Sequence, residues 1–292
     1  MGAVLHGWTF EPIALCVLVL AAWHELGLRK LLARSRRDRV APRRRRALWF
    51  YAGGAVVMLA VLSPLEQRGY DYFYVRISQH LLLMFVAPVL LVLGAPWQPL
   101  VLGLPLRLRR RLYPWLVHAR GARPLRRLVK ALVTPVVAVV CFNVVMVGAL
   151  LPAVFDFSER VRPVHVWLFN GGFLFAGLIF WLLIVPSPPL RVRAADGTQV
   201  VALLVTNVIM WILAISMALF SRHPWYSVYA HIPGASLSQA SDQQLGAGIL
   251  WVCGDLWAIP PLVFAAYRVF TRESEAAEST LLSLAGVRRG AR

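Results

Sequence analysis

Long apolar runs alternate with short polar segments along nearly the whole chain. A helix needs about 20 predominantly apolar residues to cross the hydrocarbon core of a bilayer. Seven runs approach or exceed this length, and no separate soluble domain remains between them. They cover residues 10–32, 47–62, 77–93, 131–151, 164–185, 200–220 and 245–270. The pattern therefore predicts an all-α, polytopic membrane protein with seven transmembrane helices.

The third run carries two interruptions. Pro88 lies inside it, and a proline within a helix removes one backbone hydrogen bond, so we expect a kink or a loosened turn there. Gly94, Ala95 and Pro96 end the run and are followed by a second apolar stretch, residues 100–106. That stretch is too short to span a bilayer, so we expect it to be interfacial or re-entrant.

The composition supports the membrane assignment. Hydrophobic residues make up 59% of the 292 residues and charged residues only 15%, whereas soluble domains contain about 25% charged residues. An ordinary soluble enzyme is therefore excluded. The first run has no positive charge before it, unlike a cleaved signal peptide, and we interpret it as a retained helix. The three cysteines lie in apolar runs and are expected to be small core side chains.

The net charge of +18 is distributed unevenly along the chain. Of the 31 Lys and Arg residues, 26 lie in the segments 29–46, 107–130, 191–193 and 268–292. The positive-inside rule then places the N-terminus outside and the C-terminus inside. The end of the last apolar run divides the chain into a transmembrane domain, residues 1–270, and a tail, residues 271–292. We expect this tail to be cytoplasmic and flexible. The basic segments are expected to contact anionic lipids of the inner leaflet, and the charge does not indicate nucleic acid.

Three residues near the outer side form a candidate metal site. His80 lies one turn inside the third run, and His165 begins the fifth from the same side. Met84 follows His80 by four residues and so shares its helical face. Imidazole and thioether together suit Cu(I), although neutral histidine also suits zinc or iron. The alternative is that these are interface and packing residues, which is less favoured for His80 because polar groups at that depth are costly.

Further polar residues are expected to support such a site or to gate it. The residues are Gln79, Asp242, Gln243, Gln244 and Asp255. Asp255 lies within the seventh run, where a carboxylate should face the bundle. Asp255 is a proton relay, a metal ligand beside Cys253, a partner of a polar group on another helix, or a neutral, protonated acid. Asn143, Asn170 and Asn207 are expected to make hydrogen bonds between helices.

Two long segments carry a family resemblance. Residues 78–96 read SQHLLLMFVAPVLLVLGAP, and residues 241–254 read SDQQLGAGILWVCG. Both resemble signatures of the CtaG family of caa3-type cytochrome c oxidase assembly factors, and the shorter pieces 63–65 and 177–181 match it as well. The resemblance implies a multi-pass protein of the bacterial plasma membrane that helps to form active oxidase, with oxidase subunits as partners and with copper handling as a role.

The chain departs from this family pattern, as a divergent member would. Arg76 stands where the family commonly has a second histidine before the one matched by His80, and its charge opposes a cation there. Phe169 and Asn170 stand where an acid–histidine pair is usual. A Trp-His pair is replaced at 149–150, while Cys253 and Asp255 replace a proline and a glycine.

These observations lead to one hypothesis and one main alternative. The hypothesis is a non-enzymatic oxidase assembly factor that handles copper at the outer face through His80, Met84 and His165. The alternative is a transporter or channel for a metal ion or a small solute, suggested by polar groups within several spans. No nucleophile–base pair at plausible spacing indicates an enzyme.

Overall fold

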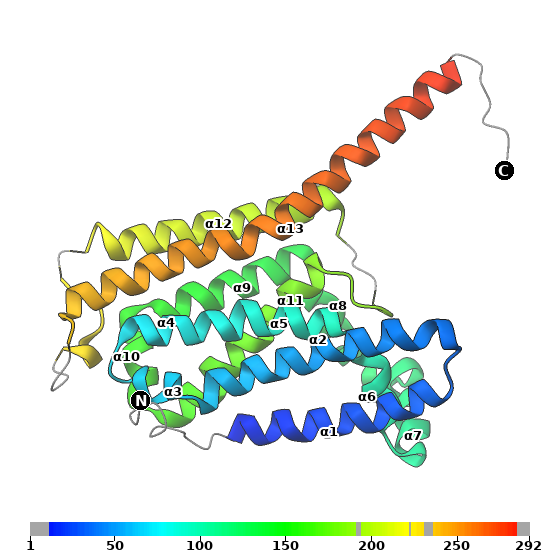
Figure 1. The fold of residues 1–292 in the computed structure, drawn as a ribbon, viewed down its shortest axis with the longest axis horizontal. Coiled ribbons are helices and arrows are strands. Elements are labelled where there is room, and N and C mark those ends of the chain that lie inside the picture. The colour runs from blue at the N-terminus through cyan, green and yellow to red at the C-terminus, as the bar shows by residue number, and fades with distance from the viewer. Residues whose placement is uncertain (1–11, 191–193, 222, 231–235, 285–292) are drawn as a thin grey trace.

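The computed structural model describes residues 12–190, 194–221, 223–230 and 236–284 (Figure 1). These ranges are almost entirely helical, and a single bridge between Ser187 and Leu190 is their only β pairing. The α-helices are α1 (Pro12–Ala33), α2 (Arg37–Leu62), α3 (Pro64–Arg68), α4 (Phe73–Leu81), α5 (Ala87–Gly94), α6 (Trp97–Gly103), α7 (Leu106–His118), α8 (Arg123–Leu132), α9 (Pro135–Leu150), α10 (Pro152–Arg160), α11 (Gly171–Ile184), α12 (Asp196–Ala218) and α13 (Gln239–Leu284). Two π-helical segments, η2 (Leu82–Val86) and η4 (Val164–Asn170), and two 3₁₀ turns, η3 (Arg120–Ala122) and η5 (Ser227–Tyr229), complete them.

The prediction of an all-α protein with seven membrane-spanning helices is confirmed. Six continuous helical segments are long and apolar enough to cross a membrane. The pair α8 and α9, bent by 74° at its junction, makes a seventh when it is taken as one span. The helices form one elongated bundle, in which α1 and α2 lie on one side, α12 and α13 on the other, and α4, α5, α9 and α11 between them (Figure 1).

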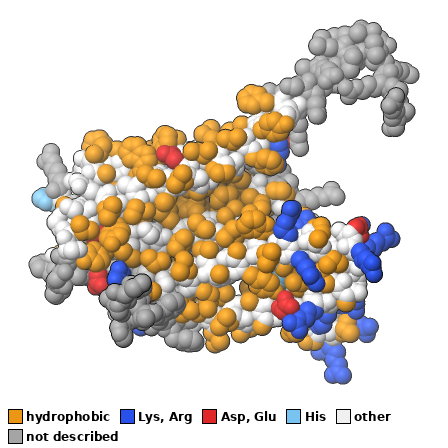
Figure 2. Space-filling model, viewed as in Figure 1, with side chains coloured by type: hydrophobic (Ala, Val, Ile, Leu, Met, Phe, Trp, Pro, Cys, Tyr) orange, Lys and Arg blue, Asp and Glu red, His pale blue; other side chains and the backbone are white. Residues whose placement is uncertain are grey.

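The two ends of the bundle differ in charge. Helix α1 begins at the end that holds α3 and α10, and α13 leaves the bundle at the opposite end, as an odd number of crossings requires (Figure 1). Lysine and arginine side chains gather around the turn between α1 and α2, while apolar side chains cover the middle of the visible face (Figure 2). The predicted orientation, with the N-terminus outside and the C-terminus inside, is based on this charge asymmetry. The orientation itself stays a prediction.

Two helices extend beyond the predicted spans. Helix α2 begins at Arg37 rather than at residue 47, because a helix can continue past the hydrocarbon core where its arginines remain solvated. Helix α13 continues to Leu284, past the predicted boundary at residue 270. The first part of the predicted tail is therefore helical, and residues 285–292 lie outside the described part of the chain. The flexibility of the tail stays a prediction.

The third crossing is built from α4, η2 and α5 in series, and Pro88 explains the break. Proline has no N–H, so the carbonyl of Met84 loses the hydrogen bond that a regular helix would supply. The backbone widens into the π-helical turn Leu82–Val86 just before it, which is the loosened turn that the sequence predicts. The short apolar stretch after the third crossing forms α6, which packs along α1 and does not cross the bundle.

Gly177 allows α11 to pack closely against this irregular turn. A Cβ atom at Gly177 would overlap the carbonyl oxygen of Met84 and would lie 2.6 Å from Cγ of Pro88. By contrast, a Cβ at Gly172, on the same helix, would meet nothing within 4 Å.

We therefore expect Gly177→Ala to destabilise the protein by about 1–3 kcal/mol, the usual cost of overpacking a core. Gly172→Ala is the matched control and should leave stability unchanged or slightly raised, since alanine favours helix. Unfolding of the purified variants in mixed detergent micelles, followed by circular dichroism, measures both. Equal stability of the two variants would contradict the close-approach role of Gly177.

Candidate functional site

Four charged or titratable side chains are buried together at the end of the bundle that holds α3 and α10. They are Glu66 on α3, Arg76 on α4, Glu159 on α10 and His165 in η4, and we call them the buried charge cluster. Arg76 and His165 have no exposed surface, Glu66 is 1% exposed, and the Glu159 side chain is 4% exposed. Charged residues are almost never this buried unless they are paired.

Arg76 lies at the centre of the cluster and contacts its other three members. Its Nη2 donates to Oε2 of Glu159 at 2.8 Å, and its Nη1 lies 3.4 Å from Oε1 of Glu66. Nη1 also lies 3.1 Å from Nε2 of His165. An arginine only donates, so this last contact is a hydrogen bond when the ring proton of His165 is on Nδ1. That nitrogen lies 3.2 Å from Oε1 of Glu159, but the two atoms do not form a hydrogen bond.

Neighbouring residues hold the guanidinium in place. Gln79, one turn along α4, accepts from Nη1 of Arg76 at 2.6 Å. Its amide group donates to Glu66 and to the carbonyl oxygen of Ala60 at 3.1 Å. The guanidinium carbon lies 4.4 Å from the ring centroid of Tyr70, a cation–π contact. A Cβ at Gly69 would lie only 2.7 Å from Cζ of Arg76, so glycine is needed there to make room.

Titration of the groups just outside the spans follows from these contacts. Burial alone would raise the pKa of the Glu66 carboxyl, but the nearby His165 ring, the charge of Arg76 and the Gln79 amide outweigh it and lower this pKa to about 2. Burial raises the pKa of the Tyr70 hydroxyl to about 12. Glu66 is therefore ionised and Tyr70 neutral at neutral pH. The carboxylate of Glu66 stabilises the fold above its ordinary pKa, and this contribution is lost as pH falls towards 2.

His80 lies beside the buried charge cluster but is not paired with it. It follows Arg76 by one helical turn and is 5% exposed. Neither of its ring nitrogens has a hydrogen-bond partner among the described residues. Leaving a buried polar group unpaired is costly, so such a group calls for an explanation. The ring packs on Phe173, with 4.5 Å between centroids.

His80 also lines a small internal cavity of about 20 Å³. Met84 and Met146 line the same cavity, and its other walls are apolar side chains. We call it the soft-donor cavity. Its volume is enough for one water-sized species.

The structure divides the predicted metal ligands into two groups that share His80. On one side lies His165, whose ring centroid is 6.2 Å from that of His80. His80, Glu159 and His165 offer ligand atoms that all lie within 4.8 Å of one another. On the other side lies Met84, which faces the soft-donor cavity together with Met146. That these residues bind a metal stays a prediction.

Of the predicted supporting residues, only Gln79 contacts the buried charge cluster. Asp242 accepts from the backbone N–H groups of Phe73 at 2.7 Å and Tyr74 at 3.0 Å, at the start of α4. Gln243 accepts from the N–H of Trp225 at 2.6 Å, and Gln244 is exposed. These contacts join α13 to the neighbouring segments.

Asp255 lies deeper in the bundle, where it pairs with α12. Its Oδ1 accepts from Nε1 of Trp211 at 2.9 Å and from Nδ2 of Asn207 at 3.2 Å. Asn143 likewise donates to Oγ1 of Thr206 at 3.0 Å. The sequence left this pairing between helices as one interpretation of Asp255 and predicted it for Asn143 and Asn207. The same prediction is wrong for Asn170, whose side chain has no hydrogen-bond partner among the described residues.

Glu66, Tyr70 and Glu159 were missed by sequence reasoning. The sequence held a signal that could have identified the two glutamates. Both are acidic residues on the predicted outer side, which holds only five of the Lys and Arg residues. Each also stands close in sequence to the start of a span that carries a candidate histidine.

We expect Arg76→Met to destabilise the protein by about 3–5 kcal/mol, because it leaves buried carboxylates without their charge partner. Arg29→Met is the control. It breaks the exposed Arg29–Glu25 pair, in which the side chains are 74% and 38% exposed, and should cost no more than about 1 kcal/mol. Unfolding in mixed micelles compares the two. A small and equal loss in both variants would show that the cluster is not a structural tie.

Comparison with known proteins identifies the family. Residues 22–272 match the family model "Cytochrome c oxidase caa3 assembly factor (Caa3_CtaG)". Neither the curated proteins nor the solved structures give a match. The family match covers both histidines of the site, the two glutamates of the cluster and all seven crossings except the start of α1. The chain therefore belongs to the Caa3_CtaG family of cytochrome c oxidase assembly factors.

Proposed function

We propose that this membrane-embedded assembly factor holds Cu(I) as cargo during the formation of cytochrome c oxidase, at the side of the membrane predicted to be outer. The observation that carries the proposal is His80, a buried histidine with two unpartnered ring nitrogens that lines one cavity together with two methionines. Soft ligands such as thioethers select Cu(I), and imidazole binds copper as well.

The buried charge cluster directs the ion towards the soft-donor cavity. Arg76 already donates towards Nε2 of His165 and to Oε2 of Glu159. A metal ion on that side would have to displace these contacts, which are costly to break in a buried place. His80, Met84 and Met146 have no such contacts to give up. We therefore propose these three residues as the Cu(I) ligands. His165, also predicted as a ligand, would join them only after leaving Arg76 or Glu159.

The proposed partners follow from the family and from the charge pattern. The oxidase subunit that receives copper would dock at the end of the bundle that holds α3 and α10, where the site lies. The arginine-rich segments at the opposite end would contact anionic lipids of the inner leaflet. The role is non-catalytic: the chain positions a cargo ion and releases it.

The transporter or channel alternative gains no specific support. It was motivated by buried polar residues within the spans, namely Asn143, Asn170, Asn207 and Asp255. In the structure Asn143, Asn207 and Asp255 make hydrogen bonds between neighbouring helices, which is the ordinary reason for polar groups in transmembrane bundles. Asn170 is buried and its side chain has no hydrogen-bond partner among the described residues.

The proposal is tested in cells that lack this protein and are complemented with variants. We expect the deletion to lower oxidase activity and copper added to the medium to restore it. His80→Ala should behave like the deletion, because the imidazole that lines the soft-donor cavity is lost. Oxidase activity and the copper content of the purified oxidase are the measurements.

Met217→Leu is the matched control, since Met217 is equally buried, at 1% exposure, but does not line the soft-donor cavity. It should complement fully, whereas the isosteric pair Met84→Leu and Met146→Leu should lower oxidase copper by about tenfold if each thioether is a ligand. Full activity of the His80→Ala strain would overturn the copper proposal. Full activity of the deletion strain would overturn the assembly role in these cells.

A further inference from the structure

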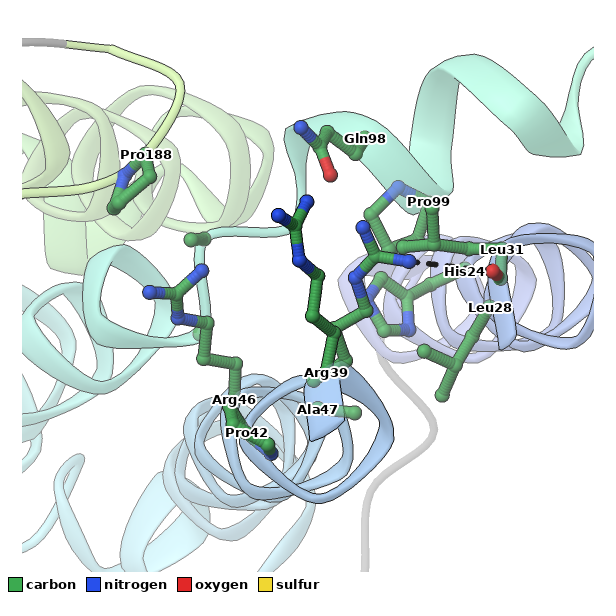
Figure 3. A pocket seen from close by; sticks show the side chains of 13 residues that line it. His24, Leu28, Leu31, Arg39, Pro42, Arg46, Ala47, Gln98, Pro99 and Pro188 are labelled. Atoms are coloured by element: carbon green, nitrogen blue, oxygen red, sulfur yellow. Dashed lines mark hydrogen bonds between the residues drawn. The ribbon is translucent and has the colours of Figure 1, made fainter. Parts of the chain in front are cut away.

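A polar cavity lies at the opposite end of the bundle from His80. It is formed where the first turns of α2 pass α1, the turn between α5 and α6, and the segment around Pro188 (Figure 3). Its volume is about 290 Å³, at the lower end of the range for small-molecule sites. We call it the arginine pocket.

Three arginines of α2 give the pocket its charge. Arg39, Arg43 and Arg46 line it, at a spacing that places them on one face of the helix. No Asp or Glu lines it. Arg43 is held by the carbonyl oxygen of Leu31 at 3.3 Å and by the hydroxyl of Ser35. The guanidinium groups of Arg39 and Arg46 have no hydrogen-bond partner in the described part of the chain, and both side chains extend from α2 into the pocket (Figure 3).

A buried histidine lies in the wall of the same pocket with one nitrogen unsatisfied. His24 has no exposed surface. The hydroxyl of Tyr51 donates to Oε2 of Glu25 at 2.8 Å, so its oxygen is free to accept from Nδ1 of His24 at 3.1 Å. Nε2 of His24 has no partner among the described residues. A hydroxyl or a protonated phosphate oxygen of a ligand would satisfy it.

A separate apolar cavity of about 260 Å³ lies between α1 and α2. Phe50 stands between the two cavities, because it lines the apolar one and its ring stacks on His24 of the arginine pocket with 4.1 Å between centroids. Val17, Leu18, Gly54 and Met58 are among the other residues that line this cavity. A cationic pocket at a bundle end, with an apolar cavity one helical turn further along the same two helices, matches a phospholipid better than a free anion.

We propose that the arginine pocket binds one anionic phospholipid. Arg39 and Arg46 would bind the headgroup phosphate, which the planar guanidinium matches with paired hydrogen bonds, and an acyl chain would lie in the apolar cavity between α1 and α2. Basic pockets between transmembrane helices are a recurring form of lipid recognition. The proposed function includes a contact between the arginine-rich segments and anionic lipids, and this pocket would give that contact one defined binding site. The lipid site does not depend on copper handling.

The test is native mass spectrometry of the purified full chain, titrated with phosphatidylglycerol, phosphatidylcholine or inorganic phosphate. We expect one molecule of phosphatidylglycerol to bind in preference to phosphatidylcholine. The double variant Arg39→Gln/Arg46→Gln should weaken that binding by about 10- to 30-fold, from roughly 1 kcal/mol per arginine. Gly54→Leu, which fills the apolar cavity, should also weaken it.

The control double variant is Arg44→Gln/Arg45→Gln, which removes the same charge from exposed positions of α2 outside the pocket. It should bind phosphatidylglycerol as the wild type does. An equal loss in both double variants would show a diffuse attraction and overturn the discrete site. Binding of inorganic phosphate as tight as that of the lipid, or an unchanged affinity in Gly54→Leu, would overturn the assignment to a phospholipid. No preference over phosphatidylcholine would overturn the anionic headgroup.

Discussion

The burial of one guanidinium between two carboxylates organises the end of the bundle that holds the candidate site. Arg76 reaches Glu66 at the end of the second crossing, Glu159 before the fifth, and His165 within the fifth. Removing these charges from water is costly, and only their mutual contacts offset that cost. The contacts exist only when α3, α4, α10 and η4 are all in place, so the cluster fixes these elements relative to one another. Gly69 leaves space for the guanidinium because it has no side chain. The ring of Tyr70 makes a cation–π contact with the guanidinium.

The same cluster explains why His80 stands apart. Arg76 contacts Nε2 of His165 and Oε2 of Glu159, and no described group makes a hydrogen bond with the imidazole one turn further along α4. The resemblance to the CtaG family implies a histidine at position 76, where this chain carries arginine. A fixed cation thus stands where the resemblance implies a second histidine. The remaining free donors, His80, Met84 and Met146, then favour a soft monovalent ion over a divalent one.

The hydrophobic pattern was sufficient to predict the helical class, the seven crossings and the disturbed turn at Pro88, because bilayer thickness and the missing N–H of proline act locally in sequence. It did not predict how far α2 and α13 extend, since solvated helix ends leave no apolar signal. The pattern of spans and charges predicted that His80 and His165 lie at the same end of the bundle, but it did not identify Glu66 and Glu159. Their importance comes from pairing across elements that are distant in sequence, which no local pattern records. Asp255 looked functional for its depth alone, and the structure gives it partners on α12.

The central claim is that the cluster around Arg76 leaves His80 free to bind copper with two thioethers. X-ray absorption at the copper K-edge of the purified protein loaded with Cu(I) tests this most directly, because nitrogen and sulfur ligands give distinct scattering. The account predicts a first shell with one imidazole nitrogen and two sulfur atoms, and loss of the sulfur contribution in the Met84→Leu/Met146→Leu variant. A shell of nitrogen and oxygen alone, unchanged in that variant, would contradict it.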